Sequence, residues 1–156
     1  MAQAPKTLDE LFHDTLKDIY FAEKKILATL PKMAKAAQNG ELKAAFEKHR
    51  DETEGQVERL NQVFAIIDKK PQGKTCAAIV GITEEGAEIM QEYKGSPALD
   101  AGLLAAAQAV EHYEISGYTT AKNLAQQLRQ GAVVALLSKS LAEEENADQL
   151  LNQVAR

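Results

Sequence analysis

Four glutamates lie within the apolar faces of four predicted helices, and they constrain the fold of this chain more than any other feature. Side chains on one face of a helix recur every three or four residues, and at that spacing each glutamate falls largely among apolar residues. A buried carboxylate without a partner is costly, so it is usually paired, protonated or bound to a metal. The four residues are Glu23, Glu52, Glu111 and Glu144.

Helix-forming residues dominate the chain, and few residues interrupt them. The 156 residues are 45% hydrophobic and 26% charged, which suits one globular domain with its own core. Only four prolines and nine glycines occur, which favours a few long helices over many short strands. The predicted helices cover residues 7–38, 41–67, 77–94, 97–129 and 131–154.

Local signals mark several ends of these helices. Thr7 and Glu10 form a capping-box pattern at the start of the first helix. Pro31 lies inside that helix and predicts a kink or a local end, because proline lacks the backbone donor and clashes with the preceding turn. Ser96 followed by Pro97 predicts a cap and the first position of the fourth helix.

The order of the helices predicts a bundle with one long crossover. Very short connections join the first two long helices and the last two, so each pair should be antiparallel neighbours. Residues 68–96 join the two hairpins and include a short helix, which is enough chain to run the length of a bundle. The sequence therefore predicts an all-α fold, a ferritin-like four-helix bundle that residues 1–156 form as a single domain.

Carboxylates that converge from four helices are typical of dinuclear metal sites in bundle cores. Four glutamates carry four negative charges, which two divalent ions would neutralise. Two more carboxylates lie one helical turn beyond Glu111 and Glu144. Carboxylate-rich sites without sulfur favour iron, manganese, magnesium or calcium over a structural zinc. The candidate metal ligands are Glu23, Glu52, Glu111, Glu144, Glu114 and Asp148.

The pattern departs from the usual di-iron bundle in its histidines. Such bundles carry Glu-x-x-His on two helices, whereas the two corresponding positions here are Gly55 and Ala147. His49 and Gln56 lie on the same helix face as Glu52. We predict that they donate hydrogen bonds to the ligands rather than bind metal, although His49 could also be a ligand or a hydrogen-bonded core histidine.

Other polar residues near these faces have simpler interpretations. Tyr20, Tyr113 and Tyr118 could donate hydroxyl groups to the carboxylates, but tyrosines at helical spacing are more often part of the core. Glu143 lies off the apolar face beside Glu144, so we predict that it is solvated surface.

Four stretches of the sequence resemble one known family. Each carries a candidate ligand, and they cover residues 18–24, 49–59, 105–115 and 141–148. Together they are similar to the YciE/YciF family of bacterial stress-associated proteins, which is a ferritin-like family. The resemblance extends over nearly the whole chain. It implies a helical bundle, a di-metal site, a homodimer and a link to stress.

Charge and hydropathy restrict the classes of partner. A net charge of −5 argues against a general nucleic-acid binder, because such a protein needs a basic face. The absence of a basic tail argues against a DNA-protecting mini-ferritin. Cys76 is the only cysteine, so one chain can form neither an internal disulfide nor a thiolate metal site. We find no secretion signal and no apolar run of membrane-spanning length, so we expect no membrane association and a cytoplasmic location.

Two functions of different classes remain open from the sequence. The first is a cytoplasmic stress protein that binds two divalent ions, iron or manganese, and either reduces peroxide or oxygen or handles iron. The second is a non-catalytic structural or interaction homodimer whose polar core contains protons and hydrogen bonds instead of metal. Without metal, crowded carboxylates should have raised pKa values and favour mildly acidic pH. With metal, protons compete for the ligands, and stability should fall at that pH.

Overall fold

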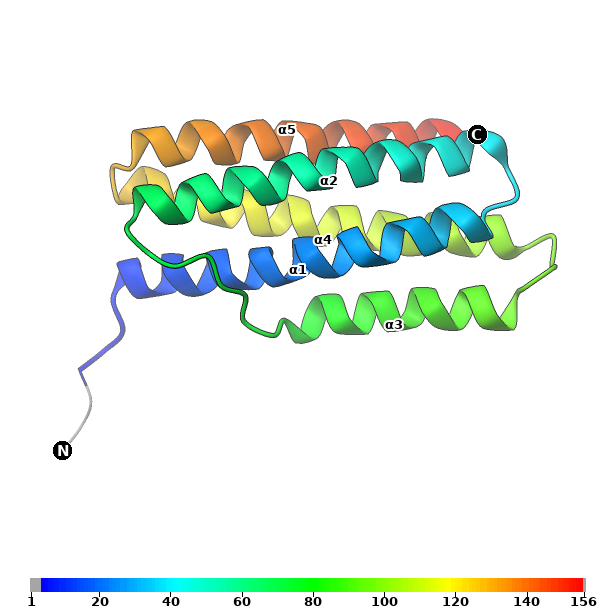
Figure 1. Ribbon diagram of the computed structural model, residues 1–156, viewed down its shortest axis with the longest axis horizontal. Coiled ribbons are helices and arrows are strands. Elements are labelled where there is room, and N and C mark those ends of the chain that lie inside the picture. The colour runs from blue at the N-terminus through cyan, green and yellow to red at the C-terminus, as the bar shows by residue number, and fades with distance from the viewer. Residues whose placement is uncertain (1–3, 156) are drawn as a thin grey trace.

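Five helices make up the described part of the chain (Figure 1). In this computed structural model, which describes residues 4–155, they are α1 (Leu8–Ala36), α2 (Gly40–Ile66), α3 (Ala77–Glu92), α4 (Leu99–Gln127) and α5 (Gly131–Val154). Helices α1, α2, α5 and α4 form a closed bundle in that spatial order, and α3 packs outside it against α4 and α1. The predicted ferritin-like bundle with a helix in its crossover is confirmed. None of the helices described is both long and apolar enough to cross a membrane.

The first helix begins where the sequence predicts and continues past its proline. The Thr7 hydroxyl accepts the backbone N–H of Glu10 at 3.2 Å, and the Glu10 carboxylate accepts the N–H of Thr7 at 3.2 Å. The predicted local end at Pro31 does not occur, since α1 continues to Ala36. Burial of Met33 in the core holds this last part of α1 in place, and such tertiary packing outweighs the local preference of proline.

The fourth helix begins two residues later than Ser96 and Pro97 predict. The Ser96 hydroxyl accepts the N–H of Ala98 at 3.0 Å, so it stabilises a turn instead of capping the helix. Helix α4 then begins at Leu99, whose N–H donates to the Ser96 carbonyl at 3.2 Å. The predicted cap is therefore wrong in position, although the helix itself is confirmed.

A carboxylate at the start of α4 holds the turn between α1 and α2. Asp100 accepts the backbone N–H of Gln38 at 2.8 Å and that of Asn39 at 2.7 Å. The Asn39 side chain in turn accepts the N–H of Leu42 at 3.0 Å and caps α2. These contacts join the two helical hairpins at one end of the bundle.

Apolar side chains fill the interior in two separate regions. One includes Phe46 and Leu103, and the other includes Phe64 and Leu137. On each bundle helix, the buried polar residues occur near the point where one apolar region ends and the other begins. The bundle therefore contains a polar layer between two apolar ends. Its members are Glu23, His49, Thr53, Gln56, Glu111, Glu114, Ser140 and Glu144.

Candidate metal centre

The polar layer brings together titratable side chains from all four bundle helices. Helix α1 contributes Glu23, α2 contributes His49, and α5 contributes Glu144. Helix α4 contributes both Glu111 and Glu114, because residues three apart lie on the same helix face. Each of these five residues is at most 5% exposed. Four carboxyl groups and one imidazole are thus enclosed between two apolar regions.

The imidazole ring of His49 lies between carboxylates of α4 and α5. Its Nδ1 is 2.9 Å from Oε1 of Glu111, and its Nε2 is 3.5 Å from Oε2 of Glu144. One donor atom from each of His49, Glu114 and Glu144 lies within 4.8 Å of the other two. Ligands that share an ion at about 2 Å each must lie about 4 Å apart or closer, so small side-chain movements would complete such a site.

The buried carboxylate oxygens have few donors. Apart from the contacts of His49 and of these carboxyl groups with one another, the oxygens of Glu111, Glu114 and Glu144 accept no hydrogen bond from any residue in the described range 4–155. The same holds for Oε1 of Glu23. Buried polar atoms normally have partners, because losing water without replacement is costly. A set of buried, unpartnered carboxylate oxygens is the chemistry that fits a divalent cation.

Burial keeps protons on most of these carboxyl groups when metal is absent. Burial, together with nearby Glu144, raises the pKa of Glu111 to about 9. Burial and the charges of Glu144 and Glu23 raise the pKa of Glu114 well above its usual value. Burial and the charge of Glu144 raise the pKa of Glu23 to about 7. At neutral pH the metal-free centre therefore holds Glu111 largely uncharged, and burial disfavours the charged form of Glu114.

One carboxylate and the imidazole remain charged and compensate each other. Burial alone would raise the pKa of Glu144, but its contacts with Glu111 and His49 lower that pKa to about 2. Burial likewise acts to lower the pKa of His49, and its contacts with Glu111 and Glu144 reverse this and raise it well above 6.5. The metal-free centre is thus close to neutral, and a metal would have to displace these protons to bind.

Tyr118 provides a buried hydrogen bond to the centre. Its hydroxyl donates to Oε2 of Glu23 at 2.8 Å, and both side chains are fully buried. Burial and the charge of Glu23 raise the pKa of Tyr118 well above its usual value, so the hydroxyl keeps its proton. Of the three tyrosines considered from the sequence, Tyr118 is the one whose hydroxyl meets a candidate ligand.

We expect Tyr118→Phe to cost about 1–3 kcal/mol of stability at pH 8, where the metal-free Glu23 is mostly ionised and would lose the hydroxyl donor of Tyr118. Urea unfolding of metal-free wild-type and variant proteins measures this difference. Tyr93→Phe is the control, since Tyr93 is 45% exposed. An equal loss in both variants would show that the hydrogen bond to Glu23 contributes nothing.

Two of the six predicted ligands lie at the margin of the centre. The side chain of Glu52 is 20% exposed, and its Oε1 is 3.8 Å from Nζ of Lys48. Asp148 is 19% exposed and lies 3.2 Å from Nε2 of His112. His49 points into the interior instead of Glu52, which is offset from it by about 60° around the axis of α2 at 3.6 residues per turn. The ligand roles of all six residues, and the donor roles of His49 and Gln56, stay predictions.

A second polar cluster links α2 to α5 beside the centre. Arg59 donates to both oxygens of Glu143, at 2.6 and 3.0 Å, and also to the Ser140 hydroxyl at 3.2 Å. The amide of Gln56 donates to Glu143 at 3.2 Å. The prediction that Glu143 is solvated surface is therefore wrong. The hint available in the sequence was that Glu143 directly precedes the inward-facing Glu144. Its partner Arg59 lies on another helix, and the sequence did not reveal that pairing.

Comparison with known proteins agrees with this architecture. The sequence is 40% identical to Protein YciF of Escherichia coli (strain K12) over 151 residues, which is 96% of this chain and 91% of that protein. The solved structure of YcfI from Rhodopseudomonas palustris has a TM-score of 0.92 at 40% identity and covers 97% of both chains. The crystal structure of the E. coli stress protein YciF has a TM-score of 0.92 at 39% identity, covering 97% of this chain and 96% of that one.

The family assignment rests on nearly the whole sequence. Residues 7–156 match the family described as "Domain of unknown function (DUF892)". The relative from E. coli is matched at high coverage both in sequence and in structure. The stretches around Glu23, Glu52, Glu111 and Glu144 had pointed to the same group of proteins. The chain therefore belongs to the YciE/YciF-like family with this domain.

Proposed function

We propose that the protein binds two divalent ions, iron or manganese, at the buried centre. The supporting observation is that the carboxylate oxygens of this centre are buried and accept almost no hydrogen bonds from the described residues. The proposed ligands are Glu23, Glu111, Glu114 and Glu144, with His49 between α4 and α5. Four ionised carboxylates would balance two divalent charges, so burial of the complete centre would carry little net electrostatic cost.

The proposed role of this centre is to handle iron or to reduce peroxide or oxygen during stress. Bound iron or manganese would supply the electrons for such a reduction. The chain itself would hold the ions, and the low exposure of its five central residues would exclude bulk water. The E. coli relative is described as a stress protein, which is consistent with this role. We place this activity in the cytoplasm.

A second candidate is a structural homodimer that never binds metal. The compensation between His49 and Glu144, with protons on Glu111 and Glu114, favours it, because the centre can be nearly neutral without any ion. A structural role has also been suggested for the relative from R. palustris. In that case the polar layer would set the alignment of the four helices rather than carry chemistry.

Metal content separates these two candidates. Protein purified without chelator and reloaded anaerobically with Fe(II) or Mn(II) should hold about two ions per chain by elemental mass spectrometry. Glu144→Ala should reduce this to background, because Glu144 contacts His49 and lies within the donor cluster. Glu145→Ala is the matched control, since the neighbouring Glu145 is exposed and should leave metal content unchanged.

Circular dichroism should first show that both variants are helical, so that a change in metal content is not caused by unfolding. Full metal in Glu144→Ala would remove the assignment of the site. Background metal in the wild-type protein would favour the structural homodimer. Loss of metal in both variants would mean that surface charge, not the buried centre, determines binding.

A further inference from the structure

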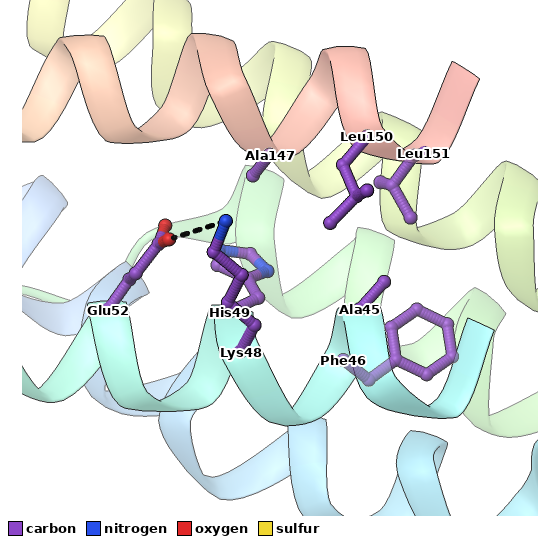
Figure 2. A pocket seen from close by; sticks show the side chains of 8 residues that line it. All are labelled: Ala45, Phe46, Lys48, His49, Glu52, Ala147, Leu150 and Leu151. Atoms are coloured by element: carbon purple, nitrogen blue, oxygen red, sulfur yellow. Dashed lines mark ion pairs between the residues drawn. The ribbon is translucent and has the colours of Figure 1, made fainter. Parts of the chain in front are cut away.

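A groove between α2 and α5 leads from the surface toward His49. Its outer part has a volume of about 410 Å³ and carries the carboxylate of Glu41 at its margin. Its inner part is about 10 Å³, which is room for about one water molecule, and reaches the ring of His49. Figure 2 shows this inner part between α2 and α5. Ala45, Lys48 and Leu150 line both parts, so the two lie next to each other.

Small side chains explain why the two helices leave space here. Ala44 and Ala45 on α2 line the groove, and Ala147 lines its inner part from α5. Core side chains elsewhere fill the space between helices at high density. Alanine reaches only one carbon beyond the backbone, so it leaves space that a leucine would fill.

Lys48 and Glu52 form the boundary between groove and centre. Lys48 is 62% exposed in its side chain, and its Nζ lies 3.8 Å from Oε1 of Glu52. In Figure 2 its side chain extends from α2, and the dashed line joins its end to Glu52. The other oxygen of Glu52 is buried and accepts no hydrogen bond from the described residues. An ammonium group therefore blocks a carboxylate that has free capacity for a cation.

We propose that this groove is the route by which divalent cations reach the buried centre, and that Lys48 slows their passage by pairing with Glu52. This inference rests on the proposed metal function. An exposed lysine changes rotamer rapidly, so the barrier can open without any movement of the backbone. Glu52, freed from Lys48, would bind an incoming ion briefly and pass it to His49 and Glu144, which explains its position at the margin.

Other openings fit this role less well. A groove of about 470 Å³ between α1 and the loop after α2 is lined by Lys24 and Lys25, and no carboxylate is among its described lining residues. A small cavity among α1, α3 and α4, which His49 also lines, is lined mainly by apolar side chains such as Ile26 and Met33. A divalent cation would lose its water there without gaining a ligand before His49. The groove between α2 and α5 combines acidic residues with an opening.

The test is the rate at which metal-free protein takes up Mn(II), followed by stopped-flow with a metal-sensitive fluorescent indicator at low ionic strength. Lys48→Ala should take up Mn(II) about three-fold faster or more, since a repelling charge near the path is removed. Ala147→Leu should fill the groove and slow uptake about ten-fold. Both variants should reach the stoichiometry of the wild-type protein.

Lys43→Ala is the matched control, because Lys43 is an exposed lysine on α2 that lines the groove toward α1 instead. It should load at the wild-type rate. Uptake at the wild-type rate in both Lys48→Ala and Ala147→Leu would overturn the route, while full final stoichiometry would leave the proposed function intact. Absence of Mn(II) binding in the wild-type protein would overturn both.

Discussion

Removal of metal should reverse the pH dependence of the protein's stability. Without metal, Glu23 and Glu111 have pKa values raised from 4.5 to about 7 and about 9, so the folded state binds protons that the unfolded state releases. This stabilisation is complete below about pH 4.5 and is lost as pH rises through the folded pKa values. For Glu23 alone the loss is about 3 kcal/mol, at about 1.4 kcal/mol per pKa unit.

The lowered pKa of Glu144 makes stability depend on pH in the opposite sense to Glu23 and Glu111, but over a lower pH range. Its pKa is lowered to about 2, so its contribution is present above about pH 4.5 and is lost as pH falls toward 2. Between pH 5 and 9 the groups with raised pKa therefore dominate. With metal bound, protons compete with the ions for the same oxygens, so stability should instead rise from pH 5 toward neutrality.

Thermal unfolding from pH 5 to 9, with chelator or with saturating Mn(II), measures both slopes. The chelated protein should lose at least roughly 6–12 °C in Tm across this range, since the loss of about 3 kcal/mol from Glu23 alone corresponds to such a shift at this chain length. Glu111→Gln should flatten the slope of the chelated protein, whereas Glu145→Gln, at an exposed position, should not. A chelated protein whose stability rises with pH would contradict the proton-filled centre.

Phe64→Ala should produce a large loss of stability at a position outside the metal centre. Phe64 is fully buried, and its ring makes edge-to-face contacts with Tyr20 at 5.5 Å and His13 at 6.2 Å. Removing a buried phenylalanine costs about 3–5 kcal/mol, because both apolar burial and packing contacts are lost. Urea unfolding in the presence of chelator measures this cost without a contribution from metal.

Tyr93→Ala serves as the comparison for this substitution, since Tyr93 is 45% exposed and its loss should change stability by about 0.5 kcal/mol or less. Phe64 belongs to an apolar region separated from His49 by several turns of α2. Folded Phe64→Ala should therefore bind metal with unchanged stoichiometry. A folded variant that binds no metal would show that the apolar region and the centre are coupled.

The sequence by itself determined the helices and the inward direction of most candidate ligands. Glu23, Glu111, Glu114 and Glu144 lie in the interior as their periodicity predicts, because helix geometry fixes which residues share a face. The capping box of Thr7 likewise depends on neighbours three residues apart and was predicted correctly. Local geometry of this kind needs no knowledge of the rest of the fold.

Only the tertiary structure decided which of two adjacent positions on a face meets the other helices. His49, and not Glu52, points into the centre, because packing against α1 and α5 sets the rotation of α2 about its own axis. The same is true of Glu143, whose partner Arg59 lies on another helix. Contacts between residues far apart in the chain depend on helix rotation and register, which the periodicity of a single helix does not encode.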